Sequence, residues 1–181
     1  MWETKFHSPG EAIELRDGSV IAGYASIFGV CDQGGDIVLP GAYSASLQRL
    51  AAGGGRVRML WQHDAGQPIG VWDEVREDAR GLWVNGRLLT EVARAREAAA
   101  LMAAGAVDGL SIGYRTVRAE KLAGGGRKLL EMELWEVSLV TFPMLPIARV
   151  SAKDNSFEDE EASVITVLAD GLQAARKALA E

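Results

Sequence analysis

Hydrophobic and polar residues alternate with a period of two over several stretches before Pro146, which is typical of β-strands that bury one face. The first alternating stretch covers residues 13–28 and brackets the turn Asp17-Gly18, so it predicts a β-hairpin. Residues 31–41 are predicted to be a loop that ends in a short strand. Further strands are predicted at 56–62, 69–75, 82–88, 109–114, 114–120 and 128–142.

Two segments have apolar residues at helical spacing instead. The first helix is predicted over 42–52, between Pro40-Gly41 and the glycine triplet 53–55, which ends it. The second is predicted over 91–104, with Thr90 as its N-cap and Gly105 at its end. Seven or eight strands with two helices between them predict a mainly β fold with flanking helices (α+β), built on a partly closed antiparallel β-barrel.

The pattern changes after the regular part of the chain. Residues 1–150 are predicted to form the barrel domain, residues 151–161 an acidic linker, and residues 162–181 an amphipathic helix. Two interpretations of this tail remain open. It is either an extension for autoprocessing or assembly targeting, or a helix that docks on the barrel or on a second copy.

The composition argues against several classes of function and location. The 181 residues include 48% hydrophobic residues and carry a formal net charge of −6, which argues against a nucleic-acid groove. Cys31 is the single cysteine, so no internal disulfide forms and the chain fits a reducing compartment. The sequence has no apolar run long enough to span a membrane and no secretion signal at its N-terminus.

Ser111 lies at the centre of the apolar run Gly109–Tyr114 and is the candidate nucleophile. A serine in a buried strand is either paired in the core or used in chemistry, because an unpaired buried hydroxyl is costly. A nucleophilic serine needs a base, and histidine has a suitable pKa. His63 closes a predicted strand, whereas His7 lies in a polar N-terminal arm. His63 is therefore the candidate base, with a structural role as the alternative.

A third residue is needed to orient the base. Asp64 is adjacent to His63, but neighbouring strand residues point to opposite faces. In the strand 128–142, Glu131 and Glu133 are expected on a solvated face. Glu136 instead shares its parity with Leu134 and Ser138 inside an apolar stretch, where a buried carboxylate requires a hydrogen-bonded partner such as His63. Structural and functional readings of Glu136 are equally open at this point.

Other chemistries find little support in the sequence. Cys31 has no cationic neighbour that would lower its pKa, so a packed or idle thiol is expected. No His/Cys pair has metal-ligand spacing, and Asp32 with Asp36 supplies too few oxygens for a calcium loop. The glycine triplets lack the lysine and the strand-loop-helix context of a phosphate loop. No metal or cofactor is expected.

The chain resembles the prohead maturation proteases of HK97-type tailed bacteriophages. Five segments carry the resemblance, in the order of the family: Gly23-Tyr24-Ala25-Ser26-Ile27-Phe28; Asp36-Ile37-Val38-Leu39-Pro40-Gly41-Ala42-Tyr43; Met59-Leu60-Trp61-Gln62-His63-Asp64 with Pro68-Ile69-Gly70; Gly109-Leu110-Ser111-Ile112-Gly113-Tyr114; and Leu134-Trp135-Glu136-Val137-Ser138-Leu139-Val140-Thr141-Phe142-Pro143.

The resemblance implies a serine endopeptidase with a barrel similar to that of the herpesvirus assembly proteases. It implies Ser111 as nucleophile, His63 as general base and Glu136 as third member, where the herpesvirus relatives use a second histidine. The implied partners are the major capsid protein with its scaffolding segment, and the protease itself through autoprocessing or a homodimer. The implied location is the host cytoplasm, inside the assembling procapsid. In its short length and its sequence, the chain also resembles the proteases of phage-like gene transfer agents.

Two alternatives are kept beside this interpretation. The chain could be an inactive relative that only binds capsid or scaffold, since fold does not fix function. It could also be an esterase, because Gly109-Leu110-Ser111-Ile112-Gly113 has the spacing of a nucleophile elbow. A strand, not a helix, is expected after Ser111, and the histidine precedes the serine, which argues against the esterase. The two glycines are expected to leave room for a substrate backbone beside Ser111.

Overall fold

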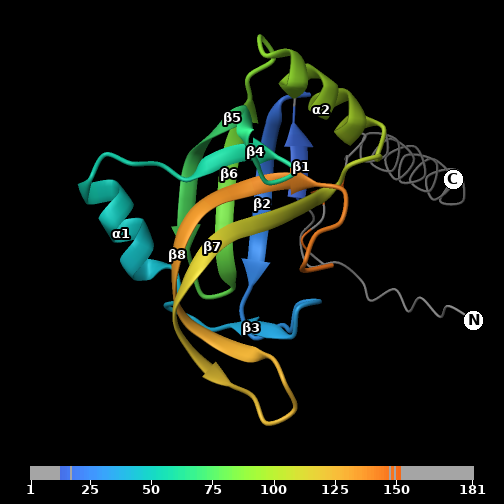
Figure 1. The fold of residues 1–181 in the computed structure, drawn as a ribbon. Coiled ribbons are helices and arrows are strands. Elements are labelled where there is room, and N and C mark those ends of the chain that lie inside the picture. The colour runs from blue at the N-terminus through green and yellow to red at the C-terminus, as the bar shows by residue number, and fades with distance from the viewer. Residues whose placement is uncertain (1–12, 17, 147, 149, 152–181) are drawn as a thin grey trace, which may run out of the picture.

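One curled, half-open sheet with two helices outside it makes up the structure, a computed structural model that describes residues 13–16, 18–146, 148 and 150–151 (Figure 1). The strands are β1 (Ile13–Arg16), β2 (Val20–Ile27), β3 (Asp36–Val38), β4 (Arg58–Trp61), β5 (Asp64–Glu77), β6 (Gly81–Leu88), β7 (Gly109–Lys121), β8 (Arg127–Val140) and β9 (Val150–Ser151). The helices are α1 (Ser44–Ala52) and α2 (Ala93–Ala103). The predicted mainly β fold with flanking helices is confirmed.

The strand order is β3-β8-β4-β5-β6-β2-β1-β9, and β7 pairs with the other edge of β8. Most pairs are antiparallel, as expected, including the hairpin β1–β2. Three pairs are parallel: β4 with β8, β3 with β8, and β1 with β9. The parallel β4–β8 pair brings the end of β4 beside a strand that lies more than 70 residues later in the chain.

The concave side of the sheet holds a single apolar core. Its members come from β2 to β8 and from α2, and include Ile21, Met59, Leu82, Ala98, Leu110, Val137 and Leu139, while Leu47 and Leu50 of α1 pack against it. Beyond Tyr114 and Leu134, β7 and β8 continue as the arm that ends at the bottom of Figure 1. Most of β7 in this arm is exposed, whereas β8 still contributes Leu129 and Met132 to the core.

Both helices are close to their predicted bounds. The carboxylate of Glu77 accepts hydrogen bonds from the backbone of Gly41 and Tyr43 ahead of α1, where the helix dipole favours a negative charge. The predicted N-cap Thr90 is wrong. Val92 is the N-cap of α2, because a turn closed by its N–H and Leu89 O comes between Thr90 and the helix.

The segment between the predicted strands 56–62 and 69–75 is mostly strand, since β5 begins at Asp64. Only Gln62 and His63 separate β4 from β5, so the connection is very tight. The predicted strands 109–114 and 114–120 form one continuous strand, β7. The predicted helix 162–181 and nearly all of the predicted linker lie outside the described residues, and Ser151 is the last residue of β9. No helix in the described part is long and apolar enough to cross a membrane.

Candidate active site

The candidate site is built on three adjacent strands, with β8 in the middle, β4 on one side and β7 on the other. Two rows of paired residues run across them. Leu60, Ser138 and Ser111 form one row, and Arg58, Glu136 and Gly113 form the next. Residues that pair directly across a ladder point to the same face. Ser111, Glu136 and Ser138 therefore share one face, opposite the core residues Val137 and Leu139.

An irregularity in the ladder sets this arrangement. The β7–β8 register shifts between Gly113, which faces Glu136, and Tyr114, which faces Leu134, so that Trp135 is an extra residue. Leu134 consequently belongs to the core with Val137. The predicted common face of Leu134 and Glu136 is wrong for this reason, although the conclusion that Glu136 needs a partner does not depend on it.

His63 lies in the two-residue turn between β4 and β5, where the backbone is unusual. Gln62 has a φ of 51° and His63 a φ of 61°, and these are the non-glycine residues with positive φ in the described part of the chain. Such left-handed conformations are costly for residues with a Cβ and persist where their surroundings hold them. The Gln62 side chain donates a hydrogen bond of 2.8 Å to Thr141 Oγ1, and the backbone N–H of Gln62 donates to Leu139 O. The end of β8 therefore fixes the turn that carries His63.

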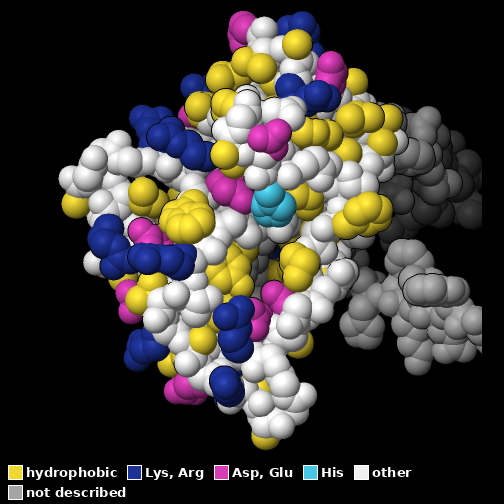
Figure 2. Space-filling model, viewed as in Figure 1, with side chains coloured by type: hydrophobic (Ala, Val, Ile, Leu, Met, Phe, Trp, Pro, Cys, Tyr) yellow, Lys and Arg dark blue, Asp and Glu magenta, His cyan; other side chains and the backbone are white. Residues whose placement is uncertain are grey.

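His63 and Glu136 are in direct contact. Nδ1 of His63 donates to Oε1 of Glu136 over 2.6 Å, and the side chains are 42% and 11% exposed, respectively. This hydrogen bond raises the pKa of His63 above its ordinary value of 6.5, against the opposing effect of partial burial. Figure 2 shows the imidazole, in cyan, at the surface beside an acidic side chain and above a hollow. Because Nδ1 is engaged by the carboxylate, Nε2 is the nitrogen left for other chemistry.

Glu136 is held by its surroundings on two further sides. Ser138 Oγ donates a hydrogen bond to Oε2, so both carboxylate oxygens have a donor. On the β7 side lies Gly113, where an added Cβ would be 2.0 Å from Oε1. Neither neighbour was assigned a role from the sequence. The pairing of Gly113 with Glu136 became visible only with the register, whereas the spacing of Glu136 and Ser138 along one strand was a usable signal.

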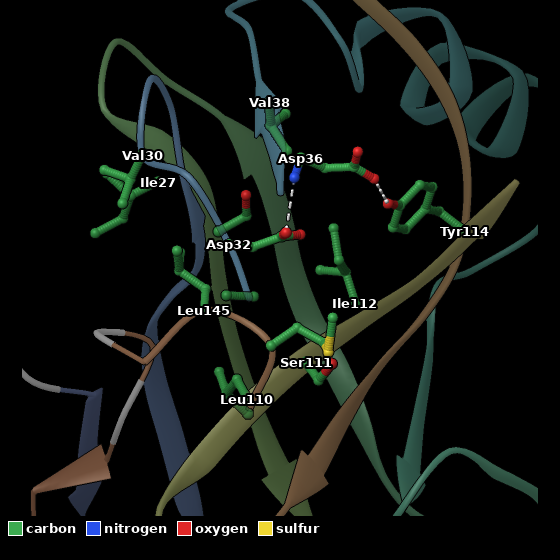
Figure 3. Close-up of a pocket in the computed structure, with 13 residues that line it drawn as sticks. Ile27, Val30, Asp32, Asp36, Val38, Leu110, Ser111, Ile112, Tyr114 and Leu145 are labelled. Carbon is green, nitrogen blue, oxygen red and sulfur yellow. Dashed lines mark hydrogen bonds between the residues drawn. The ribbon is translucent and has the colours of Figure 1, made fainter. Parts of the chain in front are cut away.

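Ser111 is 4% exposed, and its hydroxyl has no hydrogen-bond partner among the described residues. Among the described residues, the one fully buried side-chain polar atom without a hydrogen-bond partner is Tyr43 Oη. Ser111 also lines a small cavity between β7 and the segment around β3 (Figure 3). A serine in the core of an ordinary strand would be paired, so this unpaired hydroxyl is available for a reaction.

The other residues considered from the sequence are engaged elsewhere. Asp64 accepts hydrogen bonds from Gly66 N and the Gln67 side chain. Asp36 binds Arg127, whose guanidinium lowers the pKa of that carboxyl.

Glu131 and Glu133 are half-buried and face Arg49 and Arg115, respectively. Cys31 is exposed. No group of three or more potential metal-ligating side chains occurs in the described residues, and His7 lies outside them.

The glycines beside Ser111 both lie close to other parts of the chain. A Cβ on Gly109 would lie 2.7 Å from Pro143 Cδ and 2.8 Å from Val140 O. The space beside Gly113 is taken by the Glu136 carboxylate. On their Cβ side the space at both glycines is filled by the chain itself, and room for a substrate backbone along the edge of β7 stays a prediction.

A family model described as "Caudovirus prohead serine protease" matches residues 9–163, which include the whole three-strand site. The chain belongs to this family. The match confirms the resemblance drawn from the sequence motifs. It also makes the esterase alternative unnecessary, since the family model covers the Ser111 segment and the His63 segment together.

Individual relatives agree with the family assignment. The chain is 33% identical to the prohead protease of Enterobacteria phage HK97 over 153 residues, covering 83% of this chain and 64% of that protein. It is 30% identical over 116 residues to a capsid polyprotein of Pseudomonas phage PAJU2, covering 60% of this chain and 17% of that protein. The chain thus spans less than two thirds of the length of these curated relatives.

Among solved structures, the capsid assembly protease gp21 of bacteriophage T4 has a similar fold. The TM-score is 0.55 at 16% sequence identity, and the alignment covers 75% of this chain and 93% of that one. At this identity the likeness concerns the fold alone.

Proposed function

We propose that the chain is a serine endopeptidase in which Ser111 is the nucleophile, His63 the general base and Glu136 the residue that orients the base. The observation that carries the proposal is the 2.6 Å hydrogen bond between His63 Nδ1 and Glu136 Oε1. Glu136, which accepts this hydrogen bond, lies on β8 and on the same face of the sheet as the unpaired hydroxyl of Ser111 on β7. No hydrogen bond joins Ser111 to His63 among the described residues, so the imidazole must approach the hydroxyl when a substrate is bound. A polarised histidine and a free serine hydroxyl are the two groups that acyl transfer by a serine needs.

In the proposed reaction, Ser111 Oγ attacks the carbonyl carbon of a peptide bond while His63 Nε2 takes the hydroxyl proton. The C–N bond then breaks, and the same nitrogen returns the proton to the departing amine. Water attacks the acyl-enzyme in the second half of the reaction, with His63 again as base. Glu136 keeps the proton on Nδ1 throughout, so that Nε2 stays free to accept one, and it stabilises the imidazolium that forms.

The proposed substrates are the scaffolding segment of the major capsid protein and the protease itself, in the procapsid that assembles in the bacterial cytoplasm. The names of three relatives support this assignment: a prohead protease, a capsid polyprotein and a capsid assembly protease. The net charge of −6 is compatible with work in a shell before DNA enters. We further propose a barrel domain over residues 1–150, with 151–161 as linker and 162–181 as tail helix.

Co-expression with the cognate capsid protein tests the proposal. We expect the wild-type chain to shorten the capsid protein, as seen by mass spectrometry, and Ser111→Ala to abolish both this cleavage and any self-cleavage. Ser26→Ala is the matched control, since Ser26 is equally buried and lines the same cavity. Cleavage that survives in Ser111→Ala would contradict the proposal. A wild-type chain that binds the capsid protein without cutting it would support an inactive assembly protein instead.

A further inference from the structure

Ser138 is a buried serine at the site with no part in the reaction described above. Its exposure is 0%, and its hydroxyl donates a hydrogen bond to Oε2 of Glu136. It pairs directly with Ser111 across the β7–β8 ladder, so the two serines are neighbours on one face. The site therefore contains two candidate hydroxyls, and their surroundings decide which role each can have.

The two hydroxyls differ in what they contact. Ser138 is fully enclosed and already bound to a carboxylate, so it is neither reachable by a substrate nor free to pass its proton to His63. Ser111 has no hydrogen-bond partner among the described residues and lines a small cavity. These surroundings favour Ser111 as the nucleophile. The role of Ser138 is limited to its hydrogen bond with the Glu136 carboxylate.

The carboxylate has a specific need for this hydrogen bond. A glutamate side chain has three rotatable bonds, and a single contact with an imidazole that is itself 42% exposed would not fix it. The Ser138 hydroxyl fixes Oε2, and Oε1 is thereby directed at His63 Nδ1. On the opposite side, Gly113 has no Cβ, so the carboxylate can lie directly against β7. Glu136 thus has one defined position, between a hydroxyl, an imidazole and a backbone surface.

We propose that Ser138 is a positioning residue for the His63–Glu136 pair: its hydroxyl holds the Glu136 carboxylate in the orientation in which Oε1 accepts the hydrogen bond from His63 Nδ1. The inference rests on the proposed function of the site. Ser138 acts through Glu136 and touches neither the substrate nor the reacting atoms.

The charges around His63 make its ionisation a suitable readout. Glu136 is the charged group that acts on the imidazole, from β8. On the imidazole's own side, the Asp64 carboxylate is bound by Gly66 and Gln67. From α2, Arg94 is bound to Gln67 and Glu97. A change at Ser138 therefore reaches His63 through the Glu136 carboxylate.

The first experiment titrates His63 by NMR in the full chain with Ser111→Ala, which prevents self-cleavage, and His7→Gln, which removes the other imidazole signal. We expect the pKa of His63 to lie above 6.5 and to fall toward that value on Ser138→Ala, because the carboxylate loses its fixed orientation. Ser138→Cys keeps a donor group, weaker and somewhat larger than the hydroxyl, and should give a smaller fall. It also serves as the second variant if Ser138→Ala does not fold.

Ser46→Ala is the matched control. Ser46 is a serine with 2% exposure that accepts a hydrogen bond from Leu134 N on the same strand, so its loss weakens β8 without touching the carboxylate. In the active background, we expect Ser138→Ala to lower kcat by about tenfold at unchanged KM, as for loss of one hydrogen bond to a charged group. Ser46→Ala should leave both the kcat and the pKa of His63 unchanged.

The outcomes separate this inference from the proposed function. An unchanged pKa of His63 or an unchanged kcat in the Ser138 variants overturns the positioning role, and so does an equal pKa change in Ser46→Ala. Because the titration needs no activity, a pKa that falls on Ser138→Ala supports the contact even if Ser111→Ala still cleaves the capsid protein. In that case the assignment of Ser111 as nucleophile fails by itself.

Discussion

The two halves of the β7–β8 pair use the same kinds of residue in opposite ways. In the half that lies on the barrel, Glu136 has a side-chain exposure of 11% and binds His63 and Ser138. In the arm, Glu133 has a side-chain exposure of 35% and binds Arg115, which is 65% exposed. Both are glutamates with a cationic or ionisable partner on a neighbouring element, and they lie three residues apart on one strand.

The difference between the two halves shows that the energetic effect of a charged side chain depends on its exposure to water. Water screens the Glu133–Arg115 pair, and a pair of this kind contributes between zero and about 1 kcal/mol to stability. Glu136 is largely shielded from water, so each of its hydrogen bonds is both stronger and costlier to lose. The same residue type is therefore a screened surface charge in the arm, whereas on the barrel it is a shielded carboxylate in a fixed position, the proposed orienting group for His63.

The largest expected effect comes from Glu136→Gln, which keeps the shape of the side chain and removes its charge. Without the carboxylate, the imidazole loses both its preferred tautomer and the stabilisation of its protonated form. We expect kcat to fall by roughly 10⁴-fold, the size of effect seen when a triad acid is replaced by its amide. Single-turnover cleavage of a capsid-derived peptide measures it. A loss of less than tenfold would show that Glu136 has no orienting role.

The glycines on either side of Ser111 provide the second test. In Gly113→Ala the new Cβ would meet the Glu136 carboxylate at 2.0 Å, and the carboxylate can yield only by leaving His63. We expect roughly 10²-fold lower kcat, as for a displaced catalytic group, with a modest loss of thermal stability.

Gly109→Ala is the matched comparison for Gly113→Ala. Its Cβ would meet the Val140 carbonyl and the Pro143 ring, which belong to the backbone and to a rigid side chain. We expect this variant to lose about 1–3 kcal/mol of unfolding free energy instead, measured by urea denaturation. The reverse pattern, with Gly113→Ala unstable and fully active, would contradict the proposed position of Glu136.

The third prediction concerns pH. His63 must be neutral to accept a proton, so kcat/KM should fall as the pH drops through its pKa, and this acid limb should lie above pH 6.5. The free energy of unfolding depends on pH in the opposite direction. A raised pKa in the folded state stabilises the protein below pH 6.5, and this contribution is lost as the pH rises through the folded value. In Glu136→Gln the acid limb of the residual activity should shift down toward 6.5. A limb that stays in place would rule out His63 as its origin.

The smallest effect is expected from Glu133→Gln, which repeats the Glu136 substitution in the arm. The Glu133–Arg115 pair is solvent-exposed, so the free energy of unfolding should change by less than about 1 kcal/mol, and kcat should not change. Parallel chemical denaturation and cleavage assays of the two variants provide the measurement. A similar loss of activity in both variants would remove the distinction between the two halves.

The sequence predicted the fold class because alternation and helical spacing are local properties. The strands β4 (Arg58–Trp61) and β6 (Gly81–Leu88) and both helices could be found in this way. The parallel pairing of β4 with β8 could not, because it joins segments more than 70 residues apart and no local pattern encodes it. The extra residue Trp135 was missed for a related reason, since a register shift is a property of two strands together.

The candidate site was predictable to a similar degree. Ser111, His63 and Glu136 were selected from residue types, burial and the order of the family motifs, and the structure places His63 against Glu136. The positive φ of Gln62 and His63 could not be predicted from the sequence, because neither residue is a glycine or asparagine, which would indicate a left-handed turn. The contacts of Gly113 and Ser138 with the carboxylate depend on the register, which became visible only in the folded sheet.

The central place of β8 has a consequence during synthesis of the chain. His63 and Ser111 are synthesised before Glu136, yet β4, which precedes His63, and β7, which carries Ser111, do not pair with each other and meet only through β8. A nascent chain that ends before Val140 therefore lacks the strand that joins the two halves of the proposed machinery. Under the proposed function, cleavage activity should be absent until β8 is synthesised and paired.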